Sequence, residues 1–268
     1  MTDILAVYRA ERFSPNSVDK DSAILEAVGN RLATFGHSIR YVHEEELTSC
    51  PTASVIISMA RGVEALALLC QAEGRGTVVI NSTAGIKSCA RTVIDSIMRH
   101  NNLPAAPVEG NCGYWVKRGD EAAQSAADVR FAADKSERDA ILADFAARGI
   151  AHTVVTAHVE GDLVKFYGVV GTGFFYVCYP GDDGCFKFKD ELRNGRPRHY
   201  DFDREALHTS ADRLAALTGV IVYGGDCIVR SDGSYAIIDF NDWPSFSRCC
   251  DNAARSIAAA VLELMKKG

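Results

Sequence analysis

The first hundred residues alternate between short apolar runs and segments whose apolar side chains recur at helical spacing. The run ILAVYR (4–9) predicts a strand, and the segment 19–35 predicts a helix that stops at Gly36. Three further strands (IRYVHE, SVIISM and GTVVIN) and two further helices (63–71 and 82–100) continue the pattern. Strands that alternate with helices predict a parallel sheet with helices on its faces.

The pattern changes after the stretch NNLPAAP (101–107), and this proline-rich segment predicts a domain boundary. The chain then reads mainly as β-structure: GYWVKR and DVRFAA predict strands, and a nearly continuous β-segment follows the helix SERDAILADFAARG. The remaining elements are a basic loop, a helix, a hairpin and a C-terminal helix, at 181–201, 203–217, 219–241 and 250–266. The second part of the chain is therefore expected to be α+β.

The predicted hairpin carries the main chemical signal. An Asp-Gly pair (232–233) marks its turn, and a two-residue loop would place Asp226 opposite Asp239. Because side chains alternate along a strand, Asn241 lies on the same side as Asp239. Two carboxylates opposite each other destabilise a sheet, so a cation held by these oxygen ligands is expected, and Mg²⁺ is the natural candidate. The alternative is a solvated hairpin end with scattered acids.

Composition narrows the function classes. A net charge of −6 argues against non-specific nucleic-acid binding, which needs a basic surface. The N-terminus lacks a basic segment before an apolar stretch, and no apolar run reaches the roughly 18 residues of a spanning helix, so we expect neither a signal peptide nor a membrane span. Nine cysteines without a CxxC pair predict buried, reduced thiols in a cytoplasmic protein.

Four features of the sequence resemble the motifs of a known protein family. In the ATP-grasp superfamily an acidic residue ends one C-terminal strand and a D/E-x-N motif ends the next, as Asp226 and DFN (239–241) do here. A lysine that ends a strand of the central domain is matched by Lys117 in YWVK, and a basic residue before that domain is matched by Arg91 in NSTAGIKSCART. In order and spacing, nearly the whole chain resembles an ATP-grasp enzyme.

The resemblance implies a fold and cofactors. It implies an α/β ATP-grasp fold with an N-terminal parallel α/β domain (1–103), a small α+β central domain (104–159) and a C-terminal α+β domain (160–268). It also implies that the protein uses ATP together with Mg²⁺.

The resemblance also implies roles for single residues. Adenine would bind to backbone groups around Ala157 and Val159 in TAHVEGD, with Glu160 or Asp162 near the ribose. The metal would be held by Asp226, Asp239 and Asn241. The phosphates would be contacted by Lys117, Lys165 and Arg91. The catalytic residues would be Lys165, Arg91 and Asp239.

Two reactions fit such a site. The N-terminal half resembles RimK-type ligases, which activate a carboxylate as an acyl phosphate that an amine captures. The ending DFNDWPSF and the strand LVKFYGVVG instead resemble inositol-phosphate kinases. We therefore expect first a kinase that transfers the γ-phosphoryl group of ATP to a small anionic or polyhydroxy acceptor. A RimK-like carboxylate–amine ligase is the alternative, and a non-catalytic nucleotide-binding regulator is the second, because the loop after Lys117 is poor in glycine.

An anionic acceptor needs cations, and the basic loop 181–201 contains a cluster of them. We expect acceptor contacts from this cluster and from the turn after DFN, namely from Lys187, Lys189, Arg196, Arg198, His199 and Ser245. We also place the loop 11–21 at the acceptor site, since ligands of α/β sheets bind beyond the carboxyl ends of strands. A solvated loop is the alternative for the basic cluster. The expected partner is a small molecule, without nucleic acid or membrane, and a homodimer is compatible with the sequence.

Overall fold

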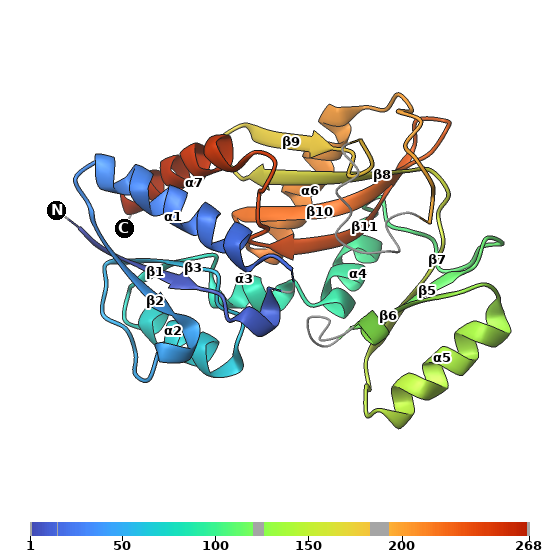
Figure 1. Cartoon of the computed structure of the whole chain (residues 1–268), viewed down its shortest axis with the longest axis horizontal. Helices are drawn as coiled ribbons and strands as arrows, with labels where there is room; N and C mark the ends of the chain where they lie inside the picture. The colour runs from blue at the N-terminus through green and yellow to red at the C-terminus, as the bar shows by residue number, and fades with distance from the viewer. Residues whose placement is uncertain (1, 15, 120–125, 183–192, 267–268) are drawn as a thin grey trace.

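Three β-sheets follow one another along the part of the chain that the computed structural model describes, residues 2–14, 16–119, 126–182 and 193–266 (Figure 1). The N-terminal sheet is parallel, with the strand order β2-β1-β3-β4. The central sheet (β6-β5-β7) and the C-terminal sheet (β11-β10-β8-β9) are antiparallel. The mixed α/β architecture expected from the sequence is confirmed.

The inner strands of the N-terminal sheet are buried on both faces, whereas its edge strand, residues 38–43, is mostly exposed. Its strands are β1 (Asp3–Tyr8), β2 (Ser38–His43), β3 (Val55–Ser58) and β4 (Val78–Ile80). Ile4 of β1 packs toward α1 (Val18–Thr34), whereas its neighbour Leu5 packs toward α2 (Val63–Gly74). Successive strand residues point to opposite faces, so a strand covered on both sides reads as one apolar run. Short 3₁₀ helices lie at η1 (Glu11–Phe13), η2 (Glu44–Glu46) and, later in the chain, η3 (Ala126–Asp128).

The prediction of a single helix over residues 82–100 is wrong. The chain forms two helices there, α3 (Thr83–Ser88) and α4 (Arg91–His100). Ala90 between them has extended backbone angles (φ −59°, ψ 137°). At the start of α4, Thr92 donates its backbone N–H and its hydroxyl to the Gly119 carbonyl at 3.2 and 3.1 Å. This contact with the central part of the chain has no counterpart in local sequence periodicity. It sets Arg91 at the first turn of α4.

The central sheet has a small core of its own. Its strands are β5 (Tyr114–Arg118), β6 (Val129–Ala132) and β7 (Thr153–Ala157), and helix α5 (Lys135–Ala147) covers one face. Tyr114 and Val116 pack against Ile141 and Phe145 of α5. Because strand side chains alternate, Trp115 and Lys117 lie on the opposite face. The central sheet and α5 lie at the end of the molecule away from the N-terminal sheet (Figure 1).

The C-terminal sheet has one face that is apolar throughout, whereas the other face is apolar toward α7 (Cys250–Met265) and carries charged side chains only in part. Its strands are β8 (Asp162–Val169), β9 (Phe174–Cys178), β10 (Val222–Val229) and β11 (Tyr235–Asp242). The apolar face, with Phe166, Tyr223 and Phe240, packs against α6 (Arg204–Thr218). Lys165, which neighbours Phe166, therefore points to the other face. Helix α7 ends the described chain.

The β10–β11 hairpin has the predicted carboxylate pair but not the predicted register. Asp226 pairs with Asp239, whereas Cys227 pairs with Ile237 and not with Ile238 as a two-residue loop requires. Arg230 N–H donates to the Ser234 carbonyl at 2.8 Å, so the loop has three residues, with Gly233 at φ 81°. A β-bulge at the Asp226/Cys227 step then restores the register toward the strand ends. The extra residue in the loop and the β-bulge shift the register in opposite directions, so Asp226 still pairs with Asp239.

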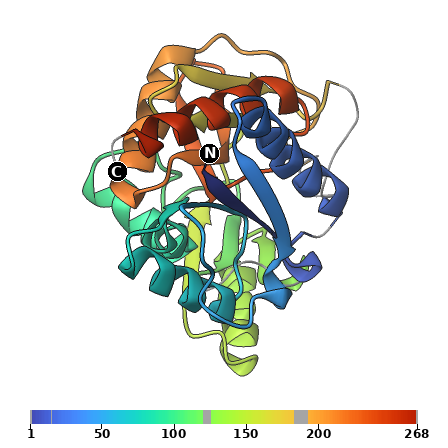
Figure 2. The same cartoon turned by 90° about the vertical axis from the view of Figure 1, so that its left-hand side faces the viewer.

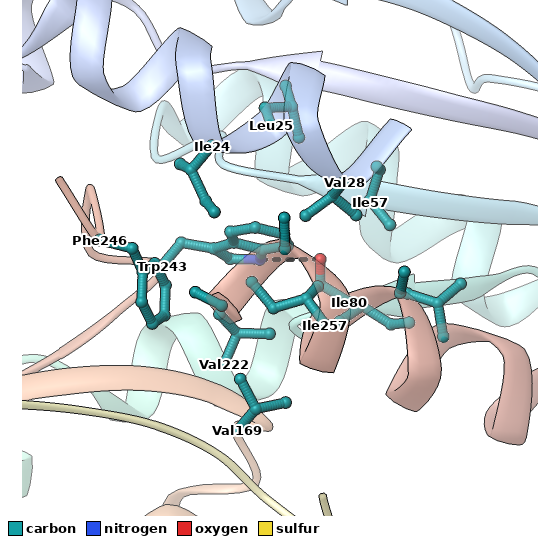
Figure 3. Close-up of a cluster of buried hydrophobic side chains, with 14 of the residues drawn as sticks. Ile24, Leu25, Val28, Ile57, Ile80, Val169, Val222, Trp243, Phe246 and Ile257 are labelled. Atoms are coloured by element: carbon teal, nitrogen blue, oxygen red, sulfur yellow. Dashed lines mark hydrogen bonds between the residues drawn. The ribbon is translucent and has the colours of Figure 1, made fainter. Parts of the chain in front are cut away.

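Trp243 joins the N-terminal and C-terminal parts of the chain. It is fully buried, and its indole N–H donates to the Ile80 carbonyl at 3.0 Å. Figure 3 shows the apolar side chains that surround it: Ile24, Leu25, Val28, Ile57, Ile80, Val169, Val222, Phe246 and Ile257. Helices α1 and α7 lie side by side in both views (Figure 1 and Figure 2). The first and third sheets therefore share one core, to which the central sheet does not contribute.

Two further expectations concern the membrane and the cysteines. Within the described ranges, no helix has the length and apolar character needed to cross a bilayer. The cysteines that are described are free thiols. Cys178 and Cys227 are buried as expected, whereas Cys70 is exposed because it lies on the outer side of α2.

Candidate active site

Three charged side chains lie in a row across the C-terminal sheet. Lys165 of β8 pairs with Asp226 of β10, and Asp226 pairs with Asp239 of β11, so the three project from one face. The Lys165 ammonium lies 3.2 and 3.3 Å from the two carboxylate oxygens of Asp226. Asn241 Nδ2 donates to Asp239 Oδ2 at 3.1 Å. The structure therefore brings Lys165 together with the residues predicted to hold a metal.

Two more cations approach Asp239 from other parts of the chain. Arg91 Nε lies 3.7 Å from Asp239 Oδ1, and Lys117 Nζ donates to the carbonyl of Ile238, the residue before Asp239, at 2.8 Å. Burial lowers the pKa of Lys117, Arg91 lowers it further, and Asp239 opposes both. A small cavity of about 30 Å³ separates Lys117 and β7 from β11. The predicted phosphate contacts thus converge on one carboxylate.

The electrostatics explain how two opposed carboxylates are tolerated. Burial alone would raise the pKa of Asp239, but Arg91, Lys117 and Lys165 outweigh it, and the pKa lies below its usual range. Asp239 is therefore ionised at neutral pH although Asp226 lies directly opposite. Like charges at this position destabilise a sheet, and the surrounding cations offset much of that repulsion.

The donor set of this row fits a hard divalent cation. It offers two carboxylates and, because Asn241 turns its amide nitrogen toward Asp239, an amide oxygen as well. Oxygen donors of this kind, few enough to leave positions for water and phosphate, are typical of Mg²⁺ sites. In the part of the chain that is described, no group of three or more His, Cys, Asp or Glu side chains is placed to hold a metal. An ion bound here would therefore need further oxygen ligands from water or substrate.

The row forms the floor of a cleft of about 1390 Å³ between the C-terminal sheet and the loops of the N-terminal sheet. Gly225, beside Asp226, also lies in the floor, and a Cβ atom there would stand 2.3 Å from the Asp239 carbonyl. Only glycine permits this approach of the two strands. The opposite wall includes residues of the segment 11–21, which was expected to be a loop but ends in the first turn of α1, and Ser245 lies in the lining too.

A buried glutamate fixes the wall of the cleft. Glu44, 3% exposed, accepts hydrogen bonds from the backbone N–H groups of Ala10 (2.9 Å), Arg61 (2.6 Å) and Gly62 (3.0 Å). Its carboxylate thus ties the loop after β1 to the loop after β3. These loops follow the carboxyl ends of parallel strands, where α/β folds bind ligands.

Two arginines connect this wall to the end of β11. Arg61 Nη2 lies 2.7 Å from Asp242 Oδ1, and Asp242 is buried on the strand face opposite to Asp239. Arg9 donates to the Trp243 carbonyl at 2.8 Å, and burial, followed by the charge of Arg61, lowers the pKa of Arg9 to about 10. Neither arginine was predicted from the sequence. The signal was present, since each comes one to three residues after a buried strand.

The backbone groups predicted to bind adenine are engaged within the chain. Ala157 N–H donates to the Pro107 carbonyl at 2.7 Å, and the Val159 carbonyl accepts from Asn194 Nδ2 at 3.0 Å. Glu160, next to Val159, is exposed. Adenine would therefore have to replace an existing hydrogen bond to reach the Val159 carbonyl.

Asp162, which was predicted to lie near the ribose, binds the backbone of another segment of the chain instead. Its side chain is buried, and its two oxygens accept the backbone N–H groups of Arg198 (2.7 Å) and Tyr200 (2.9 Å). The carboxylate thus fastens the 198–200 segment to the start of β8. Of the two acids proposed for the ribose, Glu160 is the exposed one.

The basic residues predicted to bind the acceptor do not line the cleft where they are described. Arg196, Arg198 and His199 are exposed, and none of them belongs to its lining. Ser245 does belong to it. Outside the described residues lie Lys187 and Lys189. The cations that line the cleft instead come from the N-terminal part, from β8 and from the turn after β11: Arg9, Arg12, Lys20, Arg61, Lys87, Arg91, Lys165 and Arg248.

Comparison with known proteins bears on the architecture. No family model and no curated protein matches this sequence. Among solved structures, a D-alanine–D-alanine ligase from Bacillus anthracis complexed with ATP superposes with a TM-score of 0.65 at 10% identity, over 100% of this chain and 99% of that chain. A RimK-domain ATP-grasp protein from Sphaerobacter thermophilus gives 0.64 at 18% identity, over 97% and 99%. D-Cycloserine synthetase gives 0.67 at 16% identity, over 96% and 99%. The whole chain therefore has the ATP-grasp fold.

Proposed function

We propose that the protein is an ATP- and Mg²⁺-dependent ligase that joins a carboxylate to an amine through an acyl phosphate. The observation that carries this proposal is the row of Lys165, Asp226 and Asp239, flanked by Arg91 and Lys117, on the floor of the large cleft. Cations and oxygen ligands that converge in this way suit phosphoryl transfer, where positioning and charge neutralisation do most of the catalytic work.

The reaction assigns a task to each residue of the row. Mg²⁺, when bound, would supply positive charge that neutralises the phosphates. Asp226, Asp239 and Asn241 would hold it, and Lys117, Lys165 and Arg91 would neutralise the phosphates as the substrate carboxylate oxygen attacks the γ-phosphorus and ADP leaves. The amine then attacks the acyl carbon, its proton passes to a base, and phosphate leaves. The net products are an amide, ADP and phosphate.

The ligase is favoured over the kinase that we expected first from the sequence. The superposed structures carry the names of ligases and synthetases or of the RimK domain. The cleft of about 1390 Å³ exceeds the roughly 300–1,000 Å³ of a pocket for one small molecule, so it has room for further substrates beside ATP, as either reaction requires. Of the basic cluster expected to grip a phosphorylated acceptor, the described members lie outside the cleft lining.

The acceptor that we propose is a small molecule with a carboxylate, held near the wall formed by the loops after β1 and β3. The arginines and lysines of that wall supply the positive charge that such an anion requires. The cytoplasmic location and the homodimer that are compatible with the sequence stay predictions.

The test is ATP turnover with mixtures of small carboxylates and amines, followed by mass analysis of the products. An amide formed together with ADP and phosphate supports the ligase. A product that has gained one phosphate, with no amide, replaces it with the kinase. ATP binding without turnover in any mixture points to the non-catalytic regulator.

A further inference from the structure

An aromatic cluster on the central sheet has no part in the site described above. Trp115 of β5 and Phe131 of β6 are cross-strand partners whose ring centroids lie 5.5 Å apart. His158, directly after β7, lies 5.6 Å from the Phe131 ring, and its Nδ1 accepts the Trp115 indole N–H at 3.1 Å. Trp115 shares a face of β5 with Lys117, and Lys117 bonds to β11 across that face. The cluster therefore faces the C-terminal sheet.

The cluster lies in line with the charged row. Trp115 and Lys117 are two residues apart on one strand, a step of about 6.6 Å. At the neighbouring hinge, Val159 packs against Ile228 and Ala236, and Ala236 precedes Asp239 by three residues on β11. The aromatic cluster, Lys117 and Asp239 thus follow one another in the order in which a nucleotide presents base, phosphates and metal.

Two residues of the same chain fill this cluster. The Arg193 guanidinium carbon lies 3.7 Å from the centroid of the Phe131 ring and 5.4 Å from that of Trp115. Asn194 Nδ2 donates to the Val159 carbonyl at 3.0 Å, and the Asn194 side chain lies beside the His158 ring. Because His158 Nδ1 accepts the Trp115 N–H, the other nitrogen of the neutral ring carries the proton and can donate it to an acceptor such as the Asn194 oxygen.

Arg193 and Asn194 together present the chemical features of a 6-aminopurine. A guanidinium is flat and stacks on aromatic faces, as a base does. A primary amide places a hydrogen-bond donor beside an acceptor, and the edge of adenine does the same with its amino group and a neighbouring ring nitrogen. The Val159 carbonyl and the His158 N–H would find the same partners in either group.

We propose that Trp115, Phe131 and His158 form the site for the purine base, and that Arg193 and Asn194 occupy it until nucleotide binds. The inference rests on the proposed function, since it requires that the protein binds ATP. The base must displace both residues, so the measured affinity is lower than the intrinsic affinity by the fraction of molecules in which the site is open. Removing the hydrogen bonds of Asn194 raises that fraction.

The test measures the dissociation constants of Mg²⁺ with AMP-PNP and of Mg²⁺ with tripolyphosphate, by calorimetry. Asn194→Ala should bind AMP-PNP about two- to tenfold more tightly than the wild type, because one hydrogen-bonded competitor is lost. Phe131→Ala should bind it about five- to 100-fold more weakly, because base stacking is lost. Neither change should alter the affinity for tripolyphosphate, which has no base. Arg213→Ala, which removes an exposed positive charge on α6, is the matched control.

The outcomes separate this inference from the proposed function. Unchanged or weaker AMP-PNP binding by Asn194→Ala overturns the inference, as does an equal gain for tripolyphosphate. Unchanged AMP-PNP binding by a folded Phe131→Ala overturns the assignment of the base site. If neither the wild type nor any variant binds AMP-PNP, the proposed function and the inference both fail. If all proteins bind it equally, only the inference fails.

Discussion

Asp239→Asn separates a ligand role of this carboxylate from a structural role. The substitution keeps the shape of the side chain and removes its charge, which faces Asp226 and, beyond it, Lys165 on one side and is approached by Arg91 and Lys117. It therefore removes one repulsion and several attractions in a partly exposed setting. Each is worth up to about 1 kcal/mol, so the lost repulsion offsets one of the three lost attractions, and the unliganded protein should lose no more than about 2 kcal/mol of stability.

The loss of nucleotide binding should be much larger. A ligand at 100 times its Kd stabilises a folded protein by about 2.7 kcal/mol, which raises the melting temperature of a protein of this size by roughly 5–11 °C. If the variant binds Mg²⁺ and nucleotide 100-fold more weakly, the same ligand concentration stabilises it by only about 0.4 kcal/mol. Loss of one group that stabilises transition-state charge also lowers kcat by about 10²- to 10³-fold.

Thermal melting with and without Mg²⁺ and AMP-PNP measures these effects. Asp232→Asn is the control, because it makes the same exchange in the turn of the same hairpin, where the carboxylate bonds only to Ser234 among the contacts described. The control should keep the full ligand-induced shift and Asp239→Asn should lose most of it. A full shift in Asp239→Asn would refute the metal-site assignment. A melting temperature far below that of the wild type without ligand would show that the carboxylate is needed for the fold.

Three further predictions test the surrounding structure. Arg61→Ala leaves the buried Asp242 carboxylate without its ion pair, so it should lower the free energy of unfolding by about 3–5 kcal/mol, whereas Asp242→Ala should cost less because Arg61 is partly exposed. A double variant should lose less than the sum of the two, and additive losses in chemical denaturation would contradict the pairing. Asp162→Ala should speed amide hydrogen exchange in the 198–200 segment, and unchanged exchange would show that the carboxylate does not hold it. Burial, aided by Arg193, lowers the pKa of His158, so its contribution to stability is full above pH about 6.5 and is lost as the pH falls through the folded-state pKa. His158→Gln should flatten the fall in unfolding free energy below pH about 6.5, and parallel curves for the two proteins would argue against this.

The hairpin shows how far local sequence signals reach. The Asp-Gly dipeptide predicted a tight turn and the alternation of side chains predicted that Asp239 and Asn241 share a face, both from neighbouring residues. The register between the two strands was wrong near the turn, because the same dipeptide also suits a three-residue loop. The bulge that restores the Asp226–Asp239 pair is held by distant groups, since Lys117 bonds to the Ile238 carbonyl and Ile237 N–H bonds to the Pro104 carbonyl.

The sequence by itself determined most of the order of helices and strands, the parallel sheet, and the hairpin with its opposed acids. The periodicity of apolar residues is a property of consecutive positions in the chain, so it is visible without knowledge of the fold. The tertiary structure alone decided the break before Arg91, the use of Asp162 as an anchor and the choice of cations that face the cleft. Arg61 and Asp242 are separated by 181 residues, and the contact between them leaves no periodic trace in the chain. Such contacts require the first and last thirds of the chain to lie together, as they do around Trp243.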